Sequence, residues 1–528
     1  MAGGAAISGG ADAGFAHLID PNKKWYNNRR LIILNAWLVL LLITSSTNGY
    51  DGSMMNGLQS LDQWKKDFNF PGPSMLGLLT AIQNIGSLAA YPFAPYVTDG
   101  LGRRMGIMIG ALIMCGGTAL QTASQTVNMF IGARYRLPCP QRFLIGFGLS
   151  FAANAAPLLV TELSYPSYRA ALTSAYNSLW YSGAIVMGYL RDLPDPKYMV
   201  LANPISVAGC TISAPALLLF APESPRWLVS KGREKEALRT LAYYHADGNE
   251  DDPLVKYEFE EIKAAITFER TVAAHVGYKS LFTSKGNLKR MRIIIAIAFF
   301  SQWSGNGLPS YFLNRVLDRI GITDGFDQLL INGILSIWNL CWALLASFLV
   351  ERAGRRLLFI TSAVGMLLFW TAQTICFAQS EITQRPEAGH GLIAFMFLFF
   401  AAYDIAFSPL IVSYTVEILP FAIRAKGFNV FNLTVSAAII FNQYVNPIAL
   451  DAITWKYYVV YCCWLVFELV YVYLFVVETK GLTLEETAAL FDGEEATERV
   501  AVAGHKGEAI AEKGSGSFHD EAPALDKA

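Results

Sequence analysis

The chain has 528 residues, of which 53% are hydrophobic and 16% are charged, and its formal net charge is −1. A soluble domain carries about 25% charged residues, so this composition excludes an ordinary soluble protein and indicates one that spans a membrane. The near-neutral charge gives no support for a nucleic-acid partner. The seven cysteines and six histidines follow no metal-ligand spacing, and no catalytic constellation is present, so we expect no metal, no cofactor and no enzyme activity.

Twelve apolar segments follow one another along the chain, and most of them have the roughly 20 residues that a membrane helix needs. They cover 31–60, 75–98, 105–124, 127–159, 170–190 and 198–221, and then 291–314, 328–350, 356–378, 391–416, 425–449 and 455–477. The sixth is the weakest, because Pro204 and Pro215 fall inside it. The pattern predicts an all-α membrane protein with 12 transmembrane helices.

The long charged stretch between the sixth and seventh segments predicts two six-helix halves, over 31–221 and 291–478, joined by a linker over 222–290. Apolar residues at helical spacing predict short linker helices over 234–241 and 254–270. The N-terminal segment, 1–30, and a largely disordered tail, 479–528, complete the chain. Lysine and arginine concentrate before the first segment and in the even-to-odd connections, which places both termini and the linker in the cytosol.

Three charged motifs occur twice. The first is Asp99-Gly-Leu-Gly102-Arg103-Arg104, which returns as Glu351-Arg-Ala-Gly354-Arg355-Arg356, with the acids 252 positions apart (351 − 99). The other two are both offset by 255 positions: Glu162 and Arg169 return as Glu417 and Arg424, and Glu223 returns as Glu478. Matched motifs at nearly one offset indicate two related halves, which in a membrane protein is typical of a transporter that binds its substrate between them.

These motifs, taken with others in order, resemble the sugar porter branch of the major facilitator superfamily over about residues 25–490. The further motifs are Gly49-Tyr50-Asp51, Arg142-Phe-Leu-Ile-Gly146-Phe-Gly148, Pro222-Glu-Ser-Pro-Arg226, Gln302-Trp-Ser-Gly305 and Glu478-Thr-Lys-Gly481. The amino-acid sequences that begin at Asn48 and Ser301 look like those of the fungal lactose-permease-like group. The resemblance implies the major facilitator fold and a monomeric plasma-membrane sugar carrier. It would work by alternating access and proton symport, on a mono- or disaccharide such as lactose.

The repeated charges allow two interpretations. They can be positive-inside topology signals with tight turns at Gly102 and Gly354. The resemblance adds a cytosolic gate in which an arginine at a helix end pairs with an acid on a neighbouring bundle, each exposed pair contributing about 0–1 kcal/mol. The candidate gate residues are Asp99, Arg103, Arg104, Glu162, Arg169, Glu223 and Arg226 in the first half, and Glu351, Arg355, Arg356, Glu417, Arg424 and Glu478 in the second.

Asp51 is a carboxylate within a membrane segment, where a charge is costly and therefore indicates function. The resemblance associates this position with proton coupling, with Arg142 as the partner and Arg134 as a rival. The alternative is a structural acid at the end of the first helix, because twenty residues of helix after Leu31 span about 30 Å.

Sugar binding needs hydrogen-bonding groups without charge and an aromatic face for the ring. The candidates in the apolar segments are Gln302, Asn339, Asn177, Asn306, Asn442 or Gln443, with Tyr311 and Tyr414 among the possible aromatic groups. Asn306 stands one position before the usual asparagine of the motif, where this chain has Gly307, and Val412 replaces a tryptophan frequent in hexose carriers. The alternative role for each amide is a hydrogen bond between helices, worth about 0.6 kcal/mol on average.

Two segments, 135–142 and 189–214, depart from the family pattern and suggest either gene-model errors or a divergent, transport-impaired variant. Three functions stay open: a sugar:proton symporter, a facilitative sugar uniporter with a structural Asp51, and a sugar sensor that no longer transports.

Overall fold

The computed structural model describes residues 26, 28–59, 66, 72–122, 140–166, 172, 176, 179–189, 220–272, 277–383, 386–480 and 490–491. Among these residues every regular element is helical, which confirms the predicted all-α fold. Eight described helical stretches are long and apolar enough to cross a membrane. Of the predicted tail, only positions 479–480 and 490–491 are described. Nearly all of the sixth predicted segment, 198–221, lies outside the described residues. So do residues 135–139 and 190–214, which belong to the two segments that depart from the family pattern.

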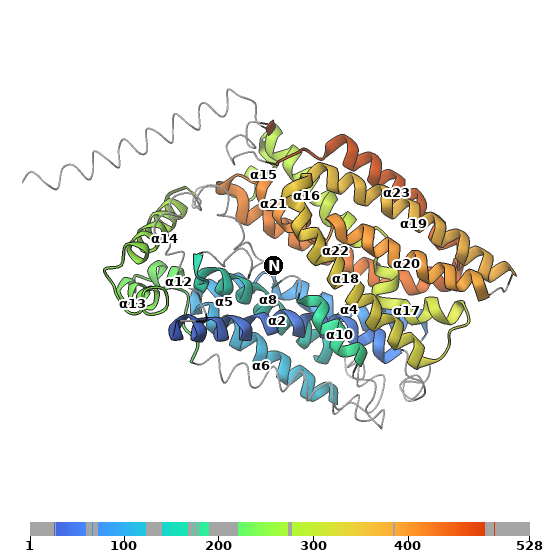
Figure 1. Ribbon diagram of the computed structural model, residues 1–528, viewed down its shortest axis with the longest axis horizontal. Helices are drawn as coiled ribbons and strands as arrows, with labels where there is room; N and C mark the ends of the chain where they lie inside the picture. Colours follow the sequence, from blue (N-terminus) through green and yellow to red (C-terminus); the bar gives the residue numbers. More distant parts are fainter. Residues whose placement is uncertain are drawn as a thin grey trace, which may run out of the picture.

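The helices form two bundles and a small linker group (Figure 1). The first bundle contains α2 (Arg29–Gln59), α4 (Pro73–Ala90), α5 (Ala94–Leu101), α6 (Arg103–Thr122), α8 (Pro140–Leu163) and α10 (Trp180–Tyr189). The linker helices are α12 (Pro225–Ser230), α13 (Glu234–His245), α14 (Pro253–Val272) and α15 (Ser280–Thr283). The second bundle contains α16 (Lys285–Trp303), α17 (Gly307–Arg319), α18 (Gly325–Ala353), α19 (Arg355–Thr383), α20 (Pro386–Ala406), α21 (Leu410–Ile418), α22 (Phe421–Ile453) and α23 (Lys456–Phe475). We call the end of the bundles to which 220–284 is attached the linker end.

Three segments that the sequence predicts as continuous helices are broken. The second predicted segment divides into α4 and α5 around Pro92, and the tenth divides into α20 and α21 before Leu410, next to Pro409. Proline lacks the N–H that a continuous helix would use. The seventh divides at Gly305, whose φ of 101° only glycine adopts readily. Beside this break the Ser304 hydroxyl donates to the buried Glu468 carboxylate of α23 at 2.8 and 3.0 Å.

The two bundles meet through three closely packed helix pairs: α4 with α22, α10 with α18, and α2 with α17. Along the first pair, Gly77 lies against the Tyr444 backbone, and the Asn84 amide donates to Gln443 at 2.8 Å. These contacts run from the end opposite the linker towards the middle of the molecule. Figure 1 shows α5 and the start of α22, at the linker end, outside this closely packed region.

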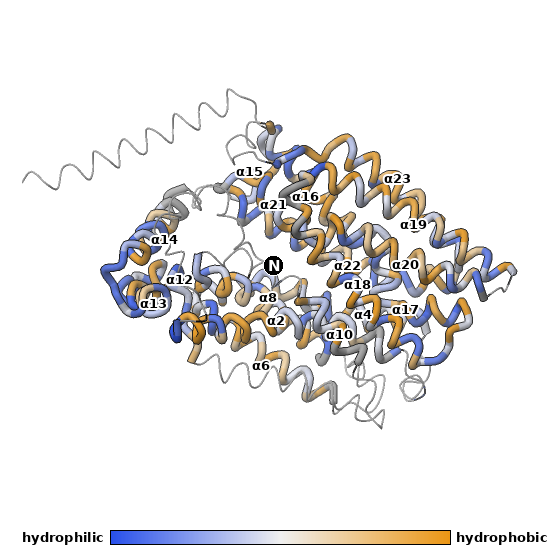
Figure 2. Tube along the Cα trace, in the orientation of Figure 1, coloured by the Kyte–Doolittle hydropathy of each residue, from blue (hydrophilic) through white to orange (hydrophobic). Residues whose placement is uncertain are grey.

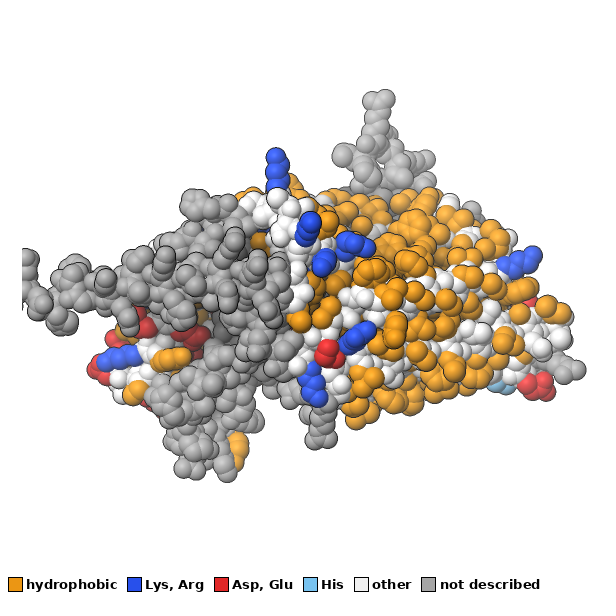
Figure 3. Space-filling view, turned by 90° about the horizontal axis from the view of Figure 1, so that it is seen from above, with side chains coloured by type: hydrophobic (Ala, Val, Ile, Leu, Met, Phe, Trp, Pro, Cys, Tyr) orange, Lys and Arg blue, Asp and Glu red, His pale blue; other side chains and the backbone are white. Residues whose placement is uncertain are grey.

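The outer surfaces are apolar. Figure 2 shows hydrophobic residues along the bundle helices, with hydrophilic residues concentrated on α12–α14 and at helix ends. Figure 3 shows one face on which hydrophobic side chains cover most of the described surface and lysines and arginines are few. A continuous apolar face of this kind is unfavourable in water and suits contact with lipid.

Candidate functional site

The first Gly-Arg-Arg loop forms a closed charge cluster at the linker end of the first bundle. The Glu223 carboxylate accepts hydrogen bonds from the backbone N–H groups of Arg103 and Arg104 at 3.1–3.3 Å, so it caps the N-terminus of α6. The Arg103 guanidinium lies 3.2 Å from Glu162 of α8 and 3.0 Å from Asp99 of α5. Gly102, with a φ of 110°, makes the sharp turn between α5 and α6 that this arrangement requires.

The second Gly-Arg-Arg loop forms the same cluster in the second bundle. Glu478 accepts from the N–H groups of Arg355 at 2.8 Å and Arg356 at 3.0 Å, and caps α19. The Arg355 guanidinium lies 3.0 Å from Glu417 of α21. Thr479 donates to Glu417 at 2.6 Å, as Ser224 donates to Glu162 in the first bundle. The repeated motifs therefore have equivalent three-dimensional roles in the two halves.

The sequence analysis predicted a gate in which each arginine pairs with an acid on a neighbouring bundle, and in the conformation described the arginines pair differently. Both arginine–glutamate pairs join helices of the same half, because each loop packs against the helix that carries its own acid. Each cluster therefore holds one half together as a unit.

The structure describes the side chains of two of the four remaining gate candidates. Arg226 lies in the first turn of α12, and the Arg424 Nε donates to the Leu419 carbonyl at 3.2 Å. Glu351 lies at the end of α18, but its side chain is outside the described set, as is all of Arg169.

The two capping glutamates differ in their electrostatics. Burial raises the pKa of Glu223 above its ordinary value, although the N–H groups of Ser224, Arg104 and Arg103 oppose this effect. Burial by itself would also raise the pKa of Glu478, but the N–H groups of its own loop and of Arg355 and Arg356 together hold it below its ordinary value. The cap of α19 is therefore the one that favours an ionised carboxylate.

We expect Glu478→Gln to lower the free energy of unfolding at pH 7 by about 1 kcal/mol, the usual size of a lost helix cap. A carboxylate with a lowered folded-state pKa stabilises fully above its unfolded pKa, and this contribution disappears as the pH falls through the lower value. The difference between wild type and variant should therefore shrink in thermal-unfolding measurements below about pH 4. Glu223→Gln is the matched control, with a smaller expected loss at pH 7. An equal loss at every pH would contradict the prediction.

Polar side chains gather where α16, α17 and α22 meet. The Asn442 Nδ2 donates to the Gln302 carbonyl at 2.6 Å, while the Gln302 side chain donates to the Ser301 hydroxyl at 3.2 Å. Asn306 donates to the Ser301 carbonyl at 3.2 Å, and its Oδ1 is buried without a hydrogen-bond partner. The Oδ1 of Asn339 on α18 is also buried and unpartnered. These carbonyl oxygens could accept hydrogen bonds from hydroxyl groups of a ligand.

Three other predicted binding residues lie elsewhere or outside the described residues. Tyr311 on α17 hydrogen-bonds with Gln443, which also accepts from Asn84, so it belongs to a network between the halves. Asn177 lies outside the described residues. Tyr414 cannot line this region, because its hydroxyl donates to the Val477 carbonyl at 2.9 Å and accepts from the Val477 N–H at the linker end.

The departure at Gly307 has a structural reason. A Cβ atom at this position would lie 2.0 Å from the Asn442 Nδ2, which is far inside van der Waals contact. Asn442 therefore occupies the space that a side chain at 307 would need, and the neighbouring Asn306 supplies the amide.

Asp51 lies inside α2, which continues to Gln59, and its side chain is 3% exposed. The charge of Arg142 on α8 acts on it, but no ion pair within 4.0 Å joins them among the described pairs. The Arg142 Nη2 instead donates to Gln83 at 2.5 Å. The Asp51 Oδ2 is buried without a partner, so the two charges are close but not locked together. Arg134 lies outside the described residues.

The sequence interpretation missed Asp404, which lies on α20 in the second half and is 0% exposed. Its Oδ1 accepts from the Tyr181 hydroxyl of α10 at 2.9 Å and from the Ser408 hydroxyl. This carboxyl therefore bridges the two halves. An acid within an apolar segment was a sequence signal that could have identified it.

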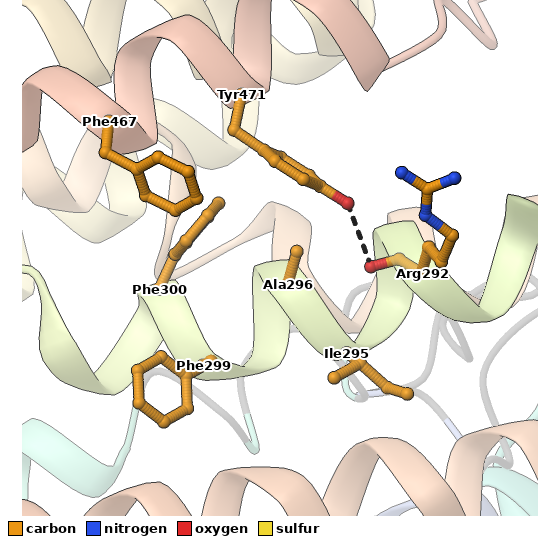
Figure 4. Close-up of a pocket in the computed structure, with 7 residues that line it drawn as sticks. All are labelled: Arg292, Ile295, Ala296, Phe299, Phe300, Phe467 and Tyr471. Atoms are coloured by element: carbon orange, nitrogen blue, oxygen red, sulfur yellow. Dashed lines mark hydrogen bonds between the residues drawn. The ribbon is translucent and has the colours of Figure 1, made fainter.

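A groove of about 340 Å³ lies elsewhere, between α16 and α23 (Figure 4). It is lined by Arg292, Ile295, Ala296, Phe299, Phe300, Phe467 and Tyr471. Its lining is almost wholly apolar and lacks the amides that fix a sugar, so it does not fit the predicted substrate.

Comparison with known proteins agrees with this architecture. The sequence model of the family described as "Sugar (and other) transporter" matches residues 37–491. Hexose transporter 2 of Kluyveromyces lactis is 29% identical over 435 residues, covering 79% of this chain and 74% of that protein. The inward open conformation of the xylose transporter XylE from E. coli has a TM-score of 0.71 at 22% identity, covering 87% of this chain and 100% of that one.

A second XylE structure, of the proton:xylose symporter bound to 6-bromo-6-deoxy-D-glucose, has a TM-score of 0.65 at 23% identity, covering 87% of this chain and 99% of that one. These likenesses identify the 12-helix major facilitator fold. The family match covers most of the chain, and the relatives are transporters, not enzymes. The chain therefore belongs to the sugar porter family of the major facilitator superfamily and is a multi-pass membrane sugar transporter.

Proposed function

We propose that this protein is a sugar:proton symporter of the plasma membrane that works by alternating access, with both termini in the cytosol. The observation that carries the proton part is the buried Asp51 beside the charge of Arg142, with one carboxylate oxygen unpartnered. An acid buried within a membrane segment is typical of a proton relay. The description of XylE as a proton:xylose symporter adds support.

Alternating access requires two rigid halves that rock against each other. The two Gly-Arg-Arg clusters give each half internal rigidity at the linker end, and the closely packed contacts between halves begin at the opposite end. We therefore assign the described conformation to a carrier open towards the linker, which the positive-inside pattern places on the cytosolic side. Closing that side would bring the two clusters together as a gate.

The sugar is proposed to bind between the halves, against Gln302, Asn306, Asn339 and Asn442, with Tyr311 and Asn177 as further candidates. The unpartnered oxygens of Asn306 and Asn339 support this position. The name of the hexose transporter relative favours a monosaccharide. The amino-acid sequences of the first and seventh segments, which resemble the lactose-permease-like group, favour a disaccharide such as lactose. The uniporter and the non-transporting sensor are the alternatives.

Uptake of radiolabelled lactose, glucose and cellobiose in a transport-deficient yeast tests this proposal. We expect uptake of at least one sugar, reduced by a protonophore because the driving gradient is removed. Uptake that a protonophore does not change would favour the uniporter. Absence of uptake in cells that carry the protein at the plasma membrane would favour the sensor.

A further inference from the structure

Asp404 differs from the other buried carboxyl groups in where its hydrogen bonds lead. Its Oδ1 accepts from Tyr181, which belongs to the other half, while Oδ2 is buried without a partner. Ser408, in the break between α20 and α21, also donates to Oδ1. By contrast, Glu468 is equally buried but accepts with both oxygens from Ser304 of its own half. Of these two carboxyl groups, Asp404 is therefore the one whose surroundings change when the halves separate.

Among the described residues, no cation is found to compensate the charge of Asp404. The titratable groups that act on it are Tyr181 on α10 and Tyr403 on its own helix, and no described arginine, lysine or histidine of α10, α18 or α19 does so. In the first half, by contrast, the charge of Arg142 acts on Asp51 and compensates it. An isolated carboxylate is unfavourable when it is buried in a membrane protein, so the neutral acid is favoured while the contact is closed.

Asp404 also lies next to the proposed sugar region. The hydroxyl of its neighbour Tyr403 donates to the Ser301 carbonyl at 2.6 Å, and the same carbonyl accepts from Asn306. A change in the protonation of Asp404 would therefore occur beside the amides that we assign to the sugar.

We propose that Asp404 is a second proton-binding site of the transport cycle, protonated while Tyr181 contacts it and deprotonated when α10 moves away and admits water. This inference rests on the proposed proton symport. Water on one side supplies the proton to the carboxylate, and water on the other side receives it. No other bond forms or breaks, and the contact between the halves sets when the proton is held.

Asp404→Asn in transport-deficient yeast or proteoliposomes tests the proposal, with the sugar that the wild type takes up best. A pH difference of about one unit is worth ~1.4 kcal/mol per proton, so a coupled carrier accumulates sugar about tenfold. We expect the variant to reach an accumulation ratio of about 1 while keeping sugar counterflow within about threefold of the wild type, because a permanently neutral amide at this site allows the sugar-loaded carrier to exchange. Glu468→Gln is the matched control, since it removes a buried carboxyl that does not bridge the halves, and it should still accumulate sugar.

Each of the following results would overturn the proposal. Wild-type accumulation by Asp404→Asn would do so directly. A raised KM in counterflow with retained accumulation would make Asp404 a sugar ligand instead. If the wild type itself does not accumulate sugar, the proposed symport is rejected as well. If Asp51→Asn loses accumulation and Asp404→Asn keeps it, symport is retained and only the proposed role of Asp404 is rejected. Should Asp404→Asn not reach the membrane, Asp404→Glu decides: we expect its counterflow to be displaced along the pH axis, and an unchanged pH profile rejects the site.

Discussion

Asp51→Asn is expected to abolish proton-driven sugar accumulation while counterflow continues. The asparagine has the shape of the protonated carboxyl and cannot release a proton. The charge of Arg142 is therefore left without a neighbouring group that can switch between a neutral and a negative form. With a pH difference of about one unit, the accumulation ratio should fall from about 10 to about 1. Radiolabelled uptake with an imposed pH gradient, followed by counterflow without a gradient, measures the two quantities separately.

The control for this variant is Asp251→Asn, the same exchange at an exposed linker position where the carboxylate pairs with Lys256 at 2.7 Å. It should accumulate sugar as the wild type does, since exposed pairs contribute about 0–1 kcal/mol. If Asp51→Asn accumulates sugar normally, Asp51 is structural. If it loses counterflow as well, its role is in folding or sugar binding and not in coupling.

The second large effect is expected for Arg103→Ala. Its side chain is 12% exposed and pairs with that of Glu162, which is 11% exposed, so removing the arginine leaves a largely buried carboxylate without its cation. Loss of one partner of such a pair costs about 3 kcal/mol. We expect a clear fall in the thermal-unfolding temperature of the purified protein and a strong loss of uptake, because the first half no longer moves as one unit.

Arg355→Ala tests the equivalent pair in the second half. The side chains of Arg355 and Glu417 are 18% and 23% exposed, so solvent screens the charges more and the expected loss is about 2 kcal/mol. Arg233→Ala is the control, because the side chains of Arg233 and Glu236 are 49% and 56% exposed and their pair should contribute little.

A double variant tests the first pair further. Arg103→Ala/Glu162→Gln should recover part of the stability that Arg103→Ala loses. A single variant as stable as the control would show that these clusters do not hold the halves together.

The sequence predicted the class of fold because bilayer-spanning helices leave a direct compositional record. Apolar segments of sufficient length, proline and glycine positions, and charged connections are all local properties. The breaks at Pro92, Gly305 and Pro409 were visible as residues, but the sequence did not show that they would divide the helices. Whether a helix bends or ends at such a residue depends on which neighbouring groups satisfy the freed backbone atoms.

The candidate site was less predictable, since its properties depend on which helices meet. The sequence alone determined the two related halves, the repeated Gly-Arg-Arg loops and the acid within the first segment. Only the tertiary structure decided that Glu223 and Glu478 cap helices, that each arginine pairs within its own half, and that Asn442 fills the space beside Gly307. It alone brought Tyr181 to Asp404, 223 positions away. Local patterns record the environment that each residue requires, whereas contacts between distant helices arise only when their faces pack together.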